Sequence, residues 1–205
     1  VAYVHLDVKG RSSHAGSAPE AGRNAALELA HQLLQLSRLG DKSKGTTVNW
    51  TIAQAGQQGR VNVIPDKAIA IADMRMSDIK EIERVGADAT RIAGNRLIPE
   101  TEVSVTVENR RPPFGRNSAT ARVAELAQAI GIETGTTIKP VAMAYGTDAG
   151  FAFSPGSATP VVLEGLGIVG DKIHTPDEWA DLESIPGRLY LTVRLLEELG
   201  QGKGR

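Results

Sequence analysis

Ala2-Tyr3-Val4-His5-Leu6-Asp7-Val8-Lys9 opens the chain with a strict alternation of apolar and polar side chains. Val4, Leu6 and Val8 share one side of an extended backbone, and the residues between them share the other side. A period of two is typical of a strand that buries one face and exposes the other to water. The stretch therefore predicts a half-buried strand.

The segments that follow extend this strand into a βαββαβ order. After a loop over residues 12–22, the apolar positions with helical spacing are Ala26, Leu29, Leu33 and Leu36. Two alternating stretches, 46–55 and 67–76, lie on either side of a glycine-rich turn, and Val48, Trp50 and Ile52 are expected on one face of the first. A helix over about 79–92 and a strand through 103–107 complete the order. It predicts a ferredoxin-like α+β domain from residue 1 to about 110, with two helices on one face of a four-stranded sheet.

Residues 111–205 follow a different pattern, which begins after the irregular segment 110–114. The expected elements are a helix around 123–130, a short strand over 139–144, a helix from about 148, a strand over 160–166 and a helix over 184–199. The expected buried face of the last helix comprises Ile185, Leu189, Val193 and Leu196. Alternating helices and strands are typical of an α/β domain, but two or three strands alone would leave open sheet edges. We therefore expect residues 111–205 to be the C-terminal segment of a larger α/β domain, and the chain, which begins at Val1 without an initiator Met, to be part of a longer protein.

Composition narrows the classes of function. A length of 205 residues allows one large core or two small ones. The formal net charge of −1 argues against a dedicated nucleic-acid or anionic-membrane surface. The chain has no cysteine, so disulfides and cysteine-bound metals are excluded. No run approaches the roughly 18 apolar residues of a membrane helix. We expect neither nucleic acid nor membrane as a partner.

His174 is the first candidate for chemistry, in the motif Ile173-His174-Thr175-Pro176-Asp177-Glu178 beyond the apolar run 159–166. Imidazole is a common zinc ligand, although a solvated loop histidine fits the spacing equally well. Zinc needs three or four protein ligands, and the sequence contains no His-Glu-x-x-His and no His-x-His. If His174 binds metal, most of its co-ligands are expected to lie upstream of Val1.

The other candidates fall in loops and at the ends of elements. They are His14 between small residues, Asn62 after the glycine-rich turn, Gly146-Thr147-Asp148 before a helix, and the arginines Arg75, Arg110 and Arg111. Guanidinium groups suit a substrate carboxylate, and the first amides of a helix can hold an anion. Each also has an ordinary structural interpretation, as a surface histidine, a turn-forming asparagine, a helix cap or a solvated arginine.

The order of these motifs is more specific than any one of them. The motifs are Ser-His-Ala-Gly (13–16), Val-Asn-Val-Ile-Pro (61–65), Ala-Asp-Met-Arg (72–75), Arg-Pro-Pro-Phe (111–114), Gly-Thr-Asp (146–148) and His-Thr-Pro-Asp-Glu (174–178). The series resembles the M20 family of zinc-dependent aminoacylases and peptidases, and looks most like its glutamate carboxypeptidase (carboxypeptidase G2) branch. The resemblance covers essentially the whole chain. It implies that residues 1–110 are a lid and dimerisation domain, and that 111–205 are the C-terminal segment of a catalytic α/β domain that carries two zinc ions.

The resemblance also implies roles for individual residues. His174 matches the last zinc ligand, and His14 matches a lid histidine that reaches the partner's active site in a homodimer and polarises the scissile carbonyl. Asn62 and Arg75 match positions that hold the substrate, with Arg75 on its carboxylate; Arg111 matches a hinge arginine near the same carboxylate. Gly146 matches a glycine whose backbone lines the pocket, although Ala144-Tyr145 stands where glycines commonly precede it. The general base and the other metal ligands would precede Val1.

Two functions remain open at this point. The first is part of a dizinc metallohydrolase that cleaves an amide bond next to an amino-acid carboxylate, in an N-acyl amino acid or a peptide; the chain alone would then be inactive. The second is a non-catalytic dimerisation or carboxylate-binding module. A His-x-Asp motif and a Glu-Glu pair in the preceding sequence would favour the enzyme, and their absence would favour the module.

Overall fold

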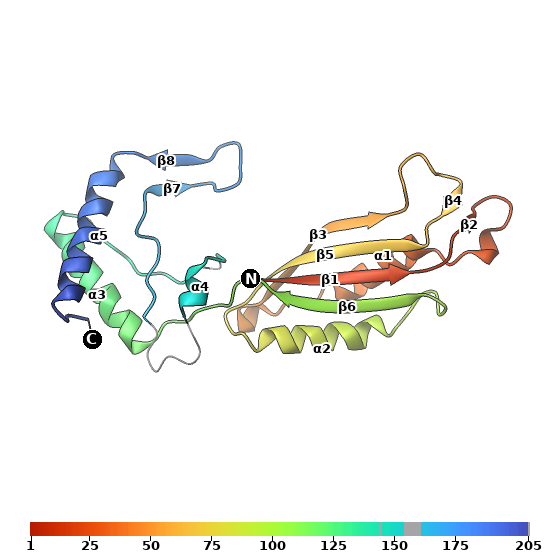
Figure 1. Ribbon diagram of the computed structural model, residues 1–205, viewed down its shortest axis with the longest axis horizontal. Helices are drawn as coiled ribbons and strands as arrows, with labels where there is room; N and C mark the ends of the chain where they lie inside the picture. The colour runs from red at the N-terminus through yellow and green to blue at the C-terminus, as the bar shows by residue number, and fades with distance from the viewer. Residues whose placement is uncertain (144, 154–160, 205) are drawn as a thin grey trace. The chain divides into compact units, whose positions relative to one another are not determined.

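The computed structural model of this chain describes residues 1–143, 145–153 and 161–204. It divides into two compact units (Figure 1). The first unit is Val1–Pro113 with Ala144–Asp148, and the second is Phe114–Met143 with Ala149–Arg205. No helix in the described part of the chain is long and apolar enough to span a membrane.

The first unit is built on one antiparallel sheet of four strands. These are β1 (Ala2–Lys9), β3 (Thr47–Ala55), β5 (Lys67–Arg75) and β6 (Glu102–Asn109), in the order β3-β5-β1-β6. Helices α1 (Ala25–Leu36) and α2 (Glu81–Ala93) cover one face of this sheet, with α1 against β5, β1 and β3 and α2 against β6 (Figure 1). The predicted βαββαβ order is confirmed.

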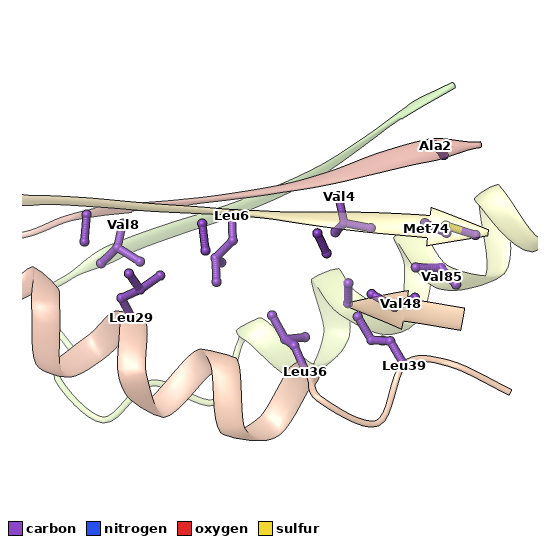
Figure 2. Close-up of a cluster of buried hydrophobic side chains, with 14 of the residues drawn as sticks. Ala2, Val4, Leu6, Val8, Leu29, Leu36, Leu39, Val48, Met74 and Val85 are labelled. Atoms are coloured by element: carbon purple, nitrogen blue, oxygen red, sulfur yellow. The ribbon is translucent and has the colours of Figure 1, made fainter. Parts of the chain in front are cut away.

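The core of this unit lies between the sheet and its two helices. Val4, Leu6 and Val8 on β1 are buried, as their alternation predicts. Figure 2 shows them on the side of the sheet where Leu29 and Leu36 of α1 lie. Burying a side chain of this size stabilises the fold by about 1.5–3 kcal/mol. The apolar face of β1 is therefore the surface on which α1 is held.

The expected face of β3 is wrong at Ile52. Trp50 pairs with Ala72 of β5, whereas Ile52 pairs with the next residue, Ile71, because the register shifts between Trp50 and Ile52. This β-bulge places one extra residue on β3 and reverses the alternation of side chains beyond it. Ile52 consequently lies on the face opposite to the helices and is 42% exposed.

Polar side chains also connect elements within the first unit. Glu28 of α1 is fully buried, and its Oε2 accepts the backbone N–H of Ile98 at 2.7 Å. Its Oε1 accepts Nε2 of Gln32 at 2.7 Å. The first of these bonds joins the loop after α2 to α1, and the second lies within α1. The short elements of the unit are β2 (Ser13–His14), β4 (Val63–Ile64) and the 3-10 turns η1 (Pro19–Ala21) and η2 (Lys42–Lys44).

The second unit is held by two long helices, α3 (Ser118–Glu133) and α5 (Ser184–Gly200). Buried residues at their contact are Val123, Ala127 and Ile130 of α3 and Leu191 and Leu195 of α5. The unit also contains the short helix α4 (Ala149–Ala152) and a hairpin of β7 (Val169–Asp171) and β8 (Trp179–Asp181). The predicted helices around 123–130 and over 184–199 are confirmed.

Two expectations for this unit are wrong. Residues 139–143 and 161–166 form no strand, and the remaining residues of those two stretches, Ala144 and Pro160, lie outside the described residues. A strand needs a neighbour for its backbone N–H and C=O groups, and the described residues offer these stretches none.

The expected buried face of α5 is instead exposed, by 63% at Leu189 and 66% at Leu196.

Candidate functional site

Three of the predicted substrate-binding residues, Arg75, Arg111 and Gly146, lie together around Val1. Arg75 ends β5 next to the pair formed by Ala2 and Met74, and the backbone N–H of Arg111 donates to the Val1 carbonyl at 2.9 Å. A Cβ atom at Gly146 would lie 1.8 Å from Cγ2 of Val1 and 3.5 Å from Nη1 of Arg75. Only glycine allows the backbone to approach Val1 and Arg75 this closely.

Both arginines of this group bind a carboxylate of their own unit. Arg75 donates from Nε to Oδ1 of Asp73 at 2.6 Å and from Nη2 to Oδ2 at 2.8 Å. Arg111 donates from Nε to Oδ1 of Asp148 at 2.9 Å. Paired N–H groups of this geometry are the usual partners of carboxylates, so the group is suited to an anionic substrate end. Such a substrate must share the guanidinium groups with Asp73 and Asp148 or displace them.

These two acidic partners were not anticipated as such. No role is predicted for Asp73, although its position two residues before Arg75 on a strand places both side chains on one face. Asp148 was expected to cap a helix, yet its carboxylate binds Arg111 and the helix that follows has only four residues. An Asp-x-Arg pattern at the end of a predicted strand is the signal that could have identified the first pair.

Arg110, also considered as a carboxylate ligand, is engaged on the open face of the sheet. Its Nη1 donates to Oε1 of Glu108 at 2.7 Å, and its guanidinium lies 5.5 Å from the ring centre of Tyr3. The hydrogen bond from Arg110, followed by that from His5, lowers the pKa of Glu108 from its usual value. The side chain of Arg110 therefore lies on the surface of the sheet, whereas its backbone N–H donates to the Val1 carbonyl at 3.0 Å, as that of Arg111 does.

His14 and Asn62 form a second group, on the small sheet of β2 and β4. His14 pairs with Val63, and the backbone N–H of Ala15 donates to the carbonyl of Asn62 at 2.8 Å. Both side chains are exposed. Nδ1 of His14 accepts the backbone N–H groups of Gly16 at 3.2 Å and Ser17 at 3.1 Å. The imidazole is thus held through Nδ1, on a side chain that is exposed.

The two groups lie at opposite ends of the sheet (Figure 1). The eight residues of β1, from Ala2 to Lys9, lead from the Val1 group towards the His14 group. At a rise of about 3.3 Å per residue, this strand separates them by about 25 Å. A small substrate cannot contact both groups of one copy of the chain.

His174 belongs to the second unit, where it lies in the loop of the β7–β8 hairpin; the described part of the apolar run before it, 161–166, forms no strand. Its backbone is left-handed, with φ of 66°, and its N–H donates to Oε2 of Glu178 at 3.1 Å. Such a backbone is uncommon for a residue other than glycine, and strained conformations cluster at functional sites. The described residues contain no group of three His, Cys, Asp or Glu side chains that could hold a metal ion. They do not by themselves make up a zinc site.

The fold and the first unit define a class of protein. Residues 1–101 match the model of a peptidase dimerisation domain, M20_dimer. These residues therefore form a dimerisation domain of the M20 peptidase family.

Individual relatives support this assignment. The chain is 35% identical to carboxypeptidase G2 of Pseudomonas sp. (strain RS-16) over 205 residues, which cover 99% of this chain and 48% of that protein. It is 24% identical to an N-carbamoyl-L-amino-acid amidohydrolase of Paenarthrobacter aurescens, over 96% of this chain and 47% of that protein. Its fold is similar to that of a tripeptidase from Staphylococcus aureus, with a TM-score of 0.78 and 24% identity over 98% of this chain and 52% of that one. The chain spans about half the length of the curated relatives that it matches along its whole length.

Proposed function

We propose that this chain supplies the dimerisation domain and the C-terminal part of the catalytic domain of a hydrolase that cleaves an amide bond next to an amino-acid carboxylate. The observation that carries the proposal is the group of Arg75, Arg111 and Gly146, in which two guanidinium groups already bind carboxylates. An N-acyl amino acid or a peptide offers such a carboxylate beside its scissile bond. Residues 1–110 would form the lid and 111–205 the catalytic segment.

The proposal assigns His174 to metal binding. The remaining ligands of a zinc pair would lie outside these 205 residues, because the described residues contain no metal-binding group of three. Bound zinc would supply a Lewis acid and an activated water. The contribution of this chain would be one imidazole, presented from a hairpin loop whose backbone is held by Glu178.

The proposal also requires a homodimer. Arg75 and Arg111 would hold the substrate carboxylate, and His14 with Asn62 would contact the same substrate near its scissile carbonyl. Since about 25 Å of strand separates the two groups in one copy, the His14 group must come from a second copy. There, His14 would donate a hydrogen bond to the carbonyl oxygen as negative charge develops on it.

Subunit complementation tests this arrangement in the protein that contains the chain. His14→Ala should retain its zinc and lose roughly 10²–10³ in kcat, the usual loss when one oxyanion donor is removed. His174→Ala should lose both zinc and turnover. A mixture of the two impaired variants should recover activity on N-acyl amino acids above that of either variant alone, because each heterodimer contains one intact site. No recovery in a mixture that demonstrably exchanges subunits would contradict the role of His14 in the partner's site.

The alternative is a non-catalytic module that dimerises and binds carboxylates. The same arginine group is compatible with it, because Arg75 and Arg111 bind carboxylates without any metal. Absence of zinc, together with no hydrolysis across a panel of N-acyl amino acids and peptides, would support the module and contradict the enzyme.

A further inference from the structure

The loop after β2 determines which nitrogen of His14 carries a proton. Nδ1 lies 3.2 Å from the backbone nitrogen of Gly16 and 3.1 Å from that of Ser17, and both N–H groups point at it. A ring nitrogen that accepts two N–H groups presents its lone pair to them and carries no hydrogen. In the neutral ring the proton must then be on Nε2.

The backbone around His14 holds this geometry in place. Ser13 and His14 pair with Ile64 and Val63, and the carbonyl of His14 accepts the N–H of Ala18 at 3.1 Å. The two N–H donors therefore come from a short turn that is closed at both ends. A side chain at Gly16 has little influence on the ring, since a Cβ there would lie at ordinary contact distance, 3.6 Å from Cε1 of His14.

His14 differs in this respect from the other histidines whose rings form hydrogen bonds in the described residues. His5 contacts Oε2 of Glu108 through Nε2, and His31 contacts the carbonyl of Asn95 through Nε2, both at 3.1 Å. In both of these rings, Nε2 is the nitrogen that contacts a protein oxygen. His14 instead accepts hydrogen bonds from its own loop at Nδ1, and its side chain is exposed.

We propose that the Gly16 and Ser17 amides hold the neutral ring of His14 in the Nε2–H tautomer, so that Nε2 is a hydrogen-bond donor to a carbonyl oxygen or oxyanion. The proposal deepens the proposed function, on which the identity of that oxygen as the substrate carbonyl rests. The tautomer itself depends only on the loop. A preset donor costs no reorganisation when negative charge develops on its acceptor.

Nitrogen NMR of the whole 205-residue chain, at a pH where the ring is neutral, tests the tautomer directly. The ¹⁵N resonances of His14 should be those of a single tautomer, with a protonated Nε2 and a bare Nδ1. A peptide of residues 12–18, in which the turn is absent, should show averaged resonances from two tautomers. A protonated Nδ1 in the chain, or the same averaging as in the peptide, would overturn the proposal.

Matched variants identify the cause. Gly16→Pro combined with Ser17→Pro removes both N–H donors and should shift the Nδ1 resonance towards the averaged position of the peptide. Gly16→Ala combined with Ser17→Ala keeps both donors and should leave the resonance unchanged. The proline variant is informative only with the rest of the amide spectrum preserved, so single proline variants serve as a second series. A single tautomer that persists without either donor would contradict the proposal.

The same variants separate this inference from the proposed function. In the active protein, the proline pair should lower kcat with little change in KM, and the alanine pair should leave both unchanged. A single tautomer in a protein without hydrolytic activity would leave the loop's role standing and overturn the proposed function. Full activity of the proline pair, despite a mixture of His14 tautomers, would show that the fixed tautomer does not contribute to catalysis.

Discussion

Glu28 is a buried carboxylate that joins two parts of the first unit. One oxygen binds the backbone N–H of Ile98, and the other binds Gln32, whose Nε2 also reaches the carbonyl of Asn95 at 3.0 Å. A buried polar group is stabilising only while its partners are present, because an unsatisfied donor in the interior costs about 1–3 kcal/mol. Glu28 therefore holds the loop after α2 through the donors that it satisfies.

Glu28→Ala should lower the free energy of unfolding by about 2–4 kcal/mol, because it leaves the N–H of Ile98 and one of the two N–H groups of the Gln32 amide without an acceptor. Urea denaturation of the chain measures the change. Glu83→Ala, at an exposed position of α2, is the matched control and should change the free energy by less than about 0.5 kcal/mol. Equal losses in the two variants would contradict the role of the buried network.

Glu81 makes the free energy of unfolding of the first unit depend on pH in the acidic range. The hydrogen bond from Arg84, and then that from Thr46 at 2.7 Å, lower the pKa of Glu81 from its ordinary value of 4.5. A lowered pKa in the folded state means that the ionised carboxylate stabilises the fold above pH 4.5 and that this contribution is lost as the pH falls further.

The free energy of unfolding should therefore decrease more steeply below pH 4.5 in the wild type than in Glu81→Gln, which cannot ionise. Denaturation curves collected at a series of acidic pH values give the two slopes. Glu83→Gln provides the control and should keep the steep slope of the wild type. If Glu81→Gln shows the same acid dependence as the wild type, the contribution assigned to Glu81 is wrong.

At the scale of elements, the two edges of the sheet differ in chemistry. β3 contains no charged residue and no proline between Thr47 and Ala55. β6, at the other edge, carries Glu102, paired with Lys9, and Glu108, paired with Arg110. Charges and prolines are the usual protection of an edge strand against pairing with another chain. The unprotected edge is β3, and α1 beside it exposes Leu27 and Leu34.

We expect the proposed homodimer to form along β3. Ala53→Lys combined with Gln54→Lys places positive charges on exposed positions of this edge, and like charges would then face each other across a two-fold axis. Light scattering should show a monomer. Ser104→Lys, on the exposed face of β6, is the control and should remain dimeric. A monomer produced only by the β6 variant would place the interface at the other edge.

Helix α5 has apolar residues on two faces, of which the second unit covers one. Leu195 is 3% exposed against α3, whereas the neighbouring Leu196 is 66% exposed. Leu195→Ala should therefore cost about 2–4 kcal/mol of unfolding free energy in this chain, and Leu196→Ala less than about 0.5 kcal/mol. Thermal denaturation of the two variants compares adjacent leucines directly. The reverse order would mean that the face predicted from the sequence is the covered one.

At the scale of the whole molecule, we expect that the 205-residue chain does not bind zinc stoichiometrically by itself. Structural and catalytic zinc sites use three or four protein ligands, and the described residues offer no such group. The 205-residue chain should emerge from dialysis against zinc without a stoichiometric ion, as measured by atomic absorption. Retention of one zinc ion per chain, lost in His174→Ala, would show that the site is complete within these residues.

The sequence by itself determined the main strands and helices of the first unit and the family of its dimerisation domain. The alternation from Ala2 to Lys9 and the helical spacing of Leu29 and Leu36 depend on which side chains face the core, and this pattern is local. The roles of His14, Asn62, Arg75, Arg111, Gly146 and His174 come from the order of short motifs and stay predictions.

Only the tertiary structure decided the features that depend on partners distant in sequence. The bulge at Ile52 is visible only against β5, and the covered face of α5 only against α3. The tertiary structure likewise showed that Asp148 binds Arg111, and that the His14 group lies at the opposite end of the sheet from Arg75. The spacing of apolar residues indicates which side chains share a buried face, but not which segment covers that face. Strand pairing, register and the separation of the two groups therefore follow from contacts that no single stretch of sequence contains.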